Sequence, residues 1–115
     1  KRAIGKVEDE YFRAFKQNKR IHATCEDYRA AATIDLEHDK KDRNKKLNIP
    51  IQVLWGKKGV VGKQFNSIKI WQKYTNKKIY GAEINSDHFI PEESPKQTLN
   101  HLKKFFLKNV KNNSK

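Results

Sequence analysis

The sequence predicts an α/β fold with two parallel strands, and three observations lead to this class. Residues 49–56 form a short, nearly continuous apolar run that is rich in β-branched and aromatic side chains. A run of this length fits a strand buried on both faces better than a core helix. Residues 78–84 give a second strand pattern, and a short helical pattern at residues 67–76 lies between the two. A strand, a helix and a second strand indicate a right-handed crossover and therefore a parallel pair.

Two further helices are predicted before the first strand. Residues 8–17 carry acids in the first turn and basic residues at the end, which complements the helix dipole. Residues 25–39 form the second helix, and Thr24 is the expected N-cap.

The last helix has the strongest local signal. Ser94 is expected at the N-cap, Pro95 at the first helical position and Gln97 at the third, which is the arrangement of a capping box. The residues expected to form its buried face are Leu99, Leu102, Phe105, Phe106 and Val110.

Two stretches resemble known motifs without meeting their requirements. In residues 56–64, five residues separate Gly56 from Gly62. A phosphate loop needs four between its outer glycines, and Gln64 stands where it needs Ser or Thr. We therefore expect a flexible connection. Residues 35–42 carry acids and a histidine at helical spacing, but interleaved Lys and Arg favour a salt-bridged helix end over a metal site. No metal or cofactor is expected.

The composition limits the classes of partner. The chain has 26 Lys+Arg against 13 Asp+Glu, a formal charge of +13. Such a charge suits an anionic partner, but the lysines are spread over the whole chain without a dense stripe, which argues against nucleic acid. No apolar stretch reaches the length of a membrane span, and Cys25 is the single cysteine. A chain without an internal disulfide suits a reducing compartment, so we expect a cytoplasmic protein.

The predicted sheet is incomplete. Two parallel strands leave both outer edges with unpaired backbone groups, and parallel strands normally belong to larger sheets. The apolar faces of the first and last helices also need more partner surface than the chain supplies. We therefore interpret the chain as the carboxyl-terminal part of a larger α/β fold. If it is stable alone, we expect a homodimer formed through an exposed strand edge.

His88 is the candidate catalytic residue. It follows the second predicted strand, and ligands of open α/β sheets bind beyond the carboxyl ends of strands. A general base is one interpretation of His88, and a solvent-exposed loop histidine is the other. A base needs a nucleophile and an orienting acid, but the sequence has no Gly-x-Ser-x-Gly or Gly-x-Asp-x-Gly elbow. Tyr28, considered alone, is most simply a core tyrosine.

Four segments resemble the haloacetate (fluoroacetate) dehalogenases, which belong to the α/β-hydrolase superfamily close to haloalkane dehalogenases and epoxide hydrolases. They are Cys25-Glu26-Asp27-Tyr28-Arg29-Ala30, Asp35-Leu36-Glu37-His38-Asp39, Val53-Leu54-Trp55-Gly56, and His88-Phe89 with Glu92-Glu93-Ser94-Pro95. The similarity runs from about Glu10 to Leu107. It implies the carboxyl-terminal part of an α/β-hydrolase fold, with the end of the helical cap in residues 1–33. The last two parallel strands and their helices then occupy residues 34–115.

The resemblance also implies a reaction in two steps on a small halogenated carboxylate. An aspartate displaces halide to give an ester on the enzyme, and His88 activates the water that hydrolyses this ester. Tyr28 matches a cap tyrosine whose hydroxyl helps to hold the leaving halide. The nucleophile, the triad acid and the arginines for the substrate carboxylate would lie before Lys1, so the isolated chain is expected to be inactive. Asp87 departs from the family, which usually has glycine there.

Two other interpretations stay open. A related hydrolase of epoxides or esters is the first, because the elbow residue that would discriminate these reactions is not in the sequence and the Tyr28 phenol can also polarise an epoxide oxygen. A small basic binding module is the second, and it predicts strongly salt-dependent binding to nucleic acid.

Overall fold

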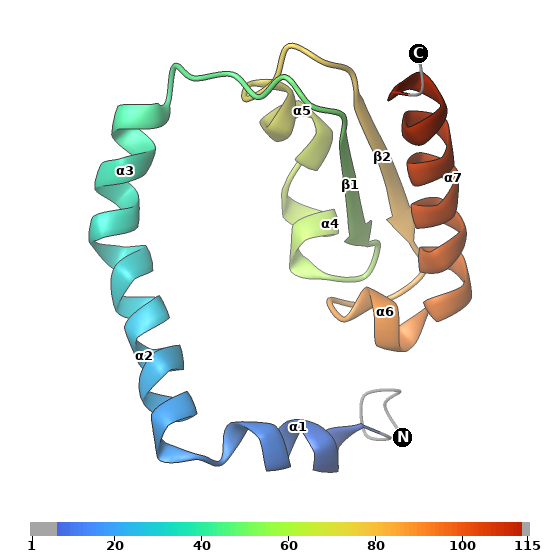
Figure 1. Ribbon diagram of the computed structural model, residues 1–115. Coiled ribbons are helices and arrows are strands. Elements are labelled where there is room, and N and C mark those ends of the chain that lie inside the picture. Colours follow the sequence, from blue (N-terminus) through green and yellow to red (C-terminus); the bar gives the residue numbers. More distant parts are fainter. Residues whose placement is uncertain (1–6, 114–115) are drawn as a thin grey trace. The chain divides into compact units, whose positions relative to one another are not determined.

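The computed structural model describes residues 7–113, with side chains described up to Val110. Residues 1–6 of the predicted cap and residues 114–115 of the predicted core therefore lie outside the described part. The chain forms two compact units, Lys1–Lys45 and Lys46–Lys115, whose elements are labelled in Figure 1. The boundary between cap and core expected at residue 33 stays a prediction.

The first unit consists of the helices α1 (Glu8–Phe15), α2 (Asn18–Ala32) and α3 (Ile34–Asp42). The prediction of a helix at 25–39 was wrong at both ends. Thr24 lies inside α2, where its hydroxyl donates to the Arg20 carbonyl at 2.9 Å and does not cap a helix. Thr33 leaves the helical region at φ −132° and ψ −94°, which separates α2 from α3.

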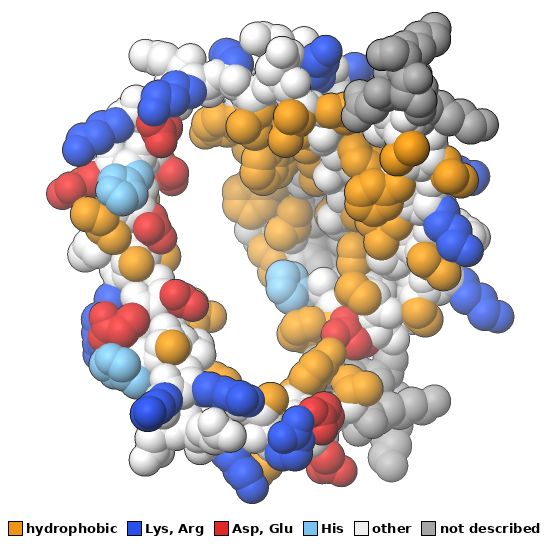
Figure 2. Space-filling model, in the orientation of Figure 1, with side chains coloured by type: hydrophobic (Ala, Val, Ile, Leu, Met, Phe, Trp, Pro, Cys, Tyr) orange, Lys and Arg blue, Asp and Glu red, His pale blue; other side chains and the backbone are white. Residues whose placement is uncertain are grey.

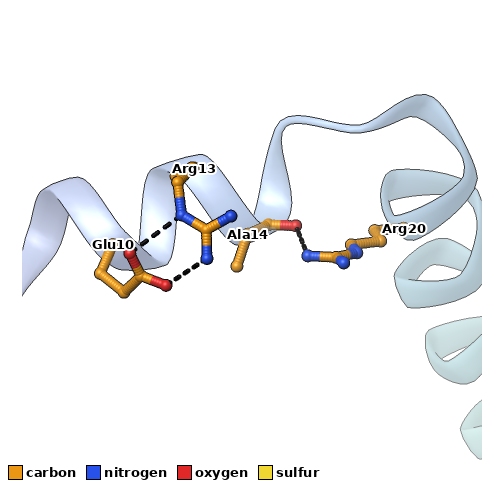
Figure 3. A network of polar contacts seen from close by, with 4 residues as sticks. All are labelled: Glu10, Arg13, Ala14 and Arg20. Carbon is orange, nitrogen blue, oxygen red and sulfur yellow. Dashed lines mark hydrogen bonds and ion pairs between the residues drawn. The ribbon is translucent and has the colours of Figure 1, made fainter.

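A polar network stabilises the corner between α1 and α2 (Figure 3). The Arg13 guanidinium pairs with the Glu10 carboxylate within α1 and holds the pKa of that carboxyl below its ordinary value. Arg20 of α2 donates from Nη1 to the Ala14 carbonyl at 2.6 Å. The carbonyls of the last helical turn have no partner within the helix, so this contact satisfies one of them and places a cation at the negative end of the α1 dipole.

The second unit is built on the parallel pair of strands β1 (Ile51–Gly56) and β2 (Ile79–Ile84). Ile51 pairs with Ile79, and the register continues to Gly56 opposite Ile84. A further parallel bridge joins Leu47 to Thr75 ahead of the strands. Both predicted strands and their parallel arrangement are thus confirmed, with starts one or two residues later than expected.

Helices cover both faces of this sheet (Figure 1). On one face, α4 (Val60–Gln64) and α5 (Ser67–Gln72) pack against the strands, and the ring of Trp55 lies among them. On the other face, α7 (Pro95–Asn113) lies along β2 and follows the short α6 (Ile90–Glu93). The Gln52 side chain donates to the His101 carbonyl there at 3.1 Å.

The helix α4 corrects the expectation of a flexible connection in residues 56–64. A Cβ on Gly62 would lie 2.5 Å from the Gly56 carbonyl oxygen and 3.0 Å from the Trp55 ring. The glycine therefore allows this segment to lie directly against the end of β1. Close packing of the backbone orders the loop, and the sequence pattern alone does not reveal it.

The core of the second unit is small. Ile84 is fully buried and Ile79 is 5% exposed. The buried face predicted for the last helix was only partly right, because Leu102 and Phe105 are half-buried whereas Leu99, Phe106 and Val110 are exposed. Figure 2 shows many apolar side chains on the visible surface of this unit. A small core with exposed apolar side chains fits the carboxyl-terminal part of a larger α/β fold.

Within residues 7–113, no helix is both long enough and apolar enough to cross a bilayer.

Candidate active site at the carboxyl end of the sheet

The carboxyl ends of β1 and β2 lie side by side, since Gly56 is the register partner of Ile84. The chain leaves β2 directly into residues 85–89, which carry His88. This is the edge at which parallel sheets bind their ligands.

Two tight turns define the path of this loop. The Ser86 N–H donates to the Ile84 carbonyl at 2.8 Å, and the Ile90 N–H donates to the His88 carbonyl at 3.1 Å. Hydrogen bonds between residues two apart define γ-turns, centred here on Asn85 and Phe89. Phe89 has φ −90° and ψ 71°, close to the values of the inverse γ-turn. His88 therefore lies between two turns of defined geometry.

The end of β1 holds the loop through backbone groups. Lys57 donates its N–H to the Ile84 carbonyl at 2.9 Å, and Lys58 donates to the Ser86 carbonyl at 3.0 Å. Gly56 makes this approach possible, because a Cβ on it would lie 1.7 Å from the Asp87 carbonyl oxygen. Glycine is needed here because it leaves space for the loop. It is not needed for an unusual backbone conformation, because no described glycine has a positive φ.

His88 lines a pocket of about 130 Å³ at this edge. The side chain is exposed, and its ring makes an edge contact with the Phe89 ring at a centroid distance of 5.1 Å. The other residues lining the pocket, all apolar or glycine, are Leu54, Trp55, Gly56, Gly59, Val61 and Ile90. An imidazole beside a small apolar pocket has the surroundings needed to accept a proton near a small organic substrate.

The second candidate, Tyr28, lies on α2 in the first unit and is 77% exposed. The interpretation of Tyr28 as a core tyrosine is therefore wrong, and the exposed phenol is free of the packing that this interpretation required. Its role toward a halide stays a prediction. In the part of the chain that the structure describes, no group of three or more His, Cys, Asp and Glu side chains is placed to hold a metal ion.

Sequence reasoning did not connect most of the residues that shape the loop with His88, although Ser94 and Gln97 were expected to form a capping box. Gly56 shapes the loop by leaving room for the Asp87 carbonyl. The side chains of Ser86, Ser94 and Gln97 shape it through hydrogen bonds to backbone groups. The signal for Gly56 was its place at the end of a predicted strand, next to Trp55. For Ser86 no signal existed, because its buried hydroxyl bonds only to the neighbouring Asp87 carbonyl.

Comparison with known proteins gave matches to several larger proteins, while no protein-family model matches the chain. A fluoroacetate dehalogenase from Burkholderia sp is 30% identical over 98 residues, which are 84% of this chain and 32% of that protein. The crystal structure of a Salmonella enterica protein described as an acyltransferase superposes with a TM-score of 0.83 at 37% identity. It matches 88% of this chain and 33% of its own.

A second crystal structure, of a protein from Nostoc sp PCC 7120 described as an α/β hydrolase, gives a TM-score of 0.81 at 45% identity. This match covers 85% of this chain and 33% of the Nostoc protein. The chain thus spans about a third of the length of each of these three relatives.

Proposed function

Since the chain has the fold of the carboxyl-terminal part of an α/β hydrolase, we propose that it supplies the histidine of a hydrolytic active site, with His88 as the general base. The observation that carries this proposal is the place of His88 in the loop after β2, beside a pocket closed on one side by the end of β1. A general base has to reach the water that it activates, and the exposed imidazole beside the pocket is accessible to water.

For the reaction we propose hydrolytic dehalogenation of a small halogenated carboxylate. An aspartate carboxylate forms a bond to the carbon that carries the halogen, and the carbon–halogen bond breaks to release halide. His88 then takes a proton from water, and the hydroxide attacks the ester carbonyl. The bond between the acyl carbon and the ester oxygen breaks, the aspartate returns as a carboxylate, and the hydroxy acid leaves with the proton from His88 on its hydroxyl oxygen. The support is the similarity to a fluoroacetate dehalogenase over 84% of this chain.

Tyr28 has the proposed role of hydrogen-bond donor to the departing halide. A phenol O–H is a suitable donor to a developing anion. This role fits our proposal that residues 1–33 are the end of a helical cap and residues 34–115 the end of the hydrolase core. The 115 residues contain no nucleophile elbow, so we propose that they do not turn over substrate alone.

Two further proposals concern the surroundings of the protein. A cytoplasmic location is supported by the single, exposed Cys25. A homodimer is proposed to form through the outer edge of a strand, because among the described residues β1 and β2 pair only with each other.

The test is a fluoride-release assay on fluoroacetate. It compares the 115-residue chain with the longest polypeptide that the gene encodes around these residues. We expect release only by a polypeptide that includes a nucleophile elbow. In that polypeptide, His88→Ala should accumulate the ester intermediate, seen in intact mass spectra as one added carboxymethyl group. His22→Ala, a change at an exposed histidine of α2, serves as the matched control. Normal turnover by His88→Ala contradicts the proposal.

A second candidate is cleavage or transfer of acyl esters. The Salmonella protein described as an acyltransferase favours it, because its identity to this chain, 37%, exceeds that of the dehalogenase. The same histidine would then activate a serine or a water molecule. Hydrolysis of p-nitrophenyl acetate without fluoride release, lost in His88→Ala, would replace the dehalogenase proposal with this one.

A further inference from the structure

The turn centred on Asn85 leaves two backbone groups without partners of their own. The hydrogen bond of this γ-turn joins the residues on either side, Ile84 and Ser86, so the Asn85 N–H and carbonyl remain available. Asn85 is exposed, so without partners in the protein these two groups would bond to water and would not hold the loop. The partners of Asn85 decide how firmly the loop that carries His88 is held.

Both partners come from the first turn of α7. The Asn85 N–H donates to Oε1 of Gln97 at 2.9 Å, and the Ser94 hydroxyl donates to the Asn85 carbonyl at 2.8 Å. The other end of the Gln97 amide, Nε2, donates to the Glu83 carbonyl at 3.4 Å. Gln97 therefore bridges Glu83, the penultimate residue of β2, and Asn85, the first residue of the loop.

The strand geometry explains why Glu83 needs this donor. Successive residues of a strand direct their backbone groups to opposite edges, and the Ile84 carbonyl bonds toward the β1 side through Lys57. The Glu83 carbonyl consequently points to the outer edge of β2. An amide side chain can donate to the Glu83 carbonyl and accept from the Asn85 N–H at once.

Ser94 and Gln97 are not used as the capping box that the sequence suggested. In a capping box the side chain at the third position reaches back to the N–H of the cap residue. Here the Ser94 N–H already donates to the Ile90 carbonyl of α6 at 2.9 Å. The two side chains are thereby free to bond to the loop.

We propose that Gln97 and Ser94 are positioning residues for His88, which hold the backbone of Asn85 and thereby fix the path of the loop to the imidazole. This proposal rests on the proposed role of His88 as the general base. Lys57 and Lys58 hold the same loop from the β1 side, so the loop is clamped between the end of β1 and the start of α7. Of the two sides, only the α7 side depends on side chains, so truncation of a side chain removes its hydrogen bonds directly.

The experiment uses Gln97→Ala, with Asn100→Ala as the matched control on an exposed position of the same helix. Amide hydrogen exchange at Asn85 and the NMR signals of the His88 imidazole are measured in both. We expect amide exchange at Asn85 to be about tenfold faster in Gln97→Ala, because the Asn85 N–H loses its hydrogen bond to the side chain. We also expect the His88 signals to shift. Asn100→Ala should match the parent in both measurements.

Gln97→Glu provides the conservative test, and Ser94→Ala decides the matter if Gln97→Ala does not fold, because loss of the Ser94 hydroxyl frees the Asn85 carbonyl and should also shift the His88 signals. The carboxylate can accept from the Asn85 N–H but cannot donate to the Glu83 carbonyl. We expect parent-like exchange at Asn85. In a polypeptide that turns over substrate, kcat should fall about tenfold in Gln97→Ala with KM within about twofold, and Gln97→Glu should recover part of kcat.

Unchanged exchange at Asn85 and unchanged His88 signals in Gln97→Ala would overturn the proposal. The failure of the hydrolase proposal looks different, because neither the exchange nor the NMR measurement needs a reaction. Normal turnover by His88→Ala in the longer polypeptide, with Asn85 freed in Gln97→Ala, would reject the general-base role and still support the clamp.

Discussion

Replacing Gly56 with alanine should separate the end of β1 from the loop that carries His88. The new Cβ would lie 1.7 Å from the Asp87 carbonyl oxygen, 2.6 Å from its carbon and 2.8 Å from the Ser86 carbonyl oxygen. All three are backbone atoms, so no side-chain rotation relieves the overlap. Ordinary contact begins at 3.4 Å, and the two backbones therefore have to move apart by about 1.7 Å.

A movement of this size breaks the hydrogen bonds on the β1 side of the loop. The bonds from Lys57 and Lys58, now 2.9 and 3.0 Å long, would exceed any hydrogen-bonding distance. At about 1 kcal/mol each, their loss lowers the free energy of unfolding by about 2 kcal/mol. With a urea m-value of about 2 kcal/mol/M, the midpoint of unfolding falls by about 1 M.

Gly59→Ala is the matched control three residues along the chain. Its new Cβ would meet its nearest neighbours at 3.5 Å, and the backbone at φ −76° and ψ 168° is open to alanine. We expect unchanged stability or a gain of up to about 1 kcal/mol from the reduced freedom of the unfolded chain. Urea unfolding followed by tryptophan fluorescence measures both variants. A Gly56→Ala midpoint equal to that of the parent would refute the steric argument.

Three further predictions concern the first unit. Arg13 lowers the pKa of Glu10, so their pair stabilises α1 above the unfolded pKa of Glu10 and this contribution is lost as pH falls through the lower folded pKa. An NMR titration of the Glu10 carboxyl checks this, and Arg13→Gln should raise its pKa. Arg20→Ala should increase amide exchange in the last turn of α1, where Lys19→Ala should not. Tyr28→Phe should change stability by less than about 0.5 kcal/mol but lower proposed halide release about tenfold, measured as the fluoride-release rate.

The sheet was predictable because its signals are local. Residues 49–56 and 78–84 have strand composition and strand length, and a helical pattern between them forces the parallel pairing that the structure shows. The place of His88 followed from the same order, since any residue just after the second strand has to lie at the carboxyl edge.

The errors arose where tertiary contacts decide the structure. The α7 sequence has apolar residues on more than one face, and only the position of the sheet selects Leu102 and Phe105 over Leu99 and Phe106. The division at Thr33 depends on a single unusual backbone conformation, which the helical pattern around it conceals. Gln97 matched a local capping motif, yet Ile90 had already satisfied the group that it was expected to reach.

The way in which β1 grips the loop has a consequence for sequence variation. Lys57, Lys58 and Asp87 take part through their amides or carbonyl, while their side chains are exposed. Substitutions at these positions can therefore change the charge around the pocket and still keep the backbone contacts that hold the His88 loop. An aspartate is tolerable at position 87 on these grounds, and all three positions are open to substitution.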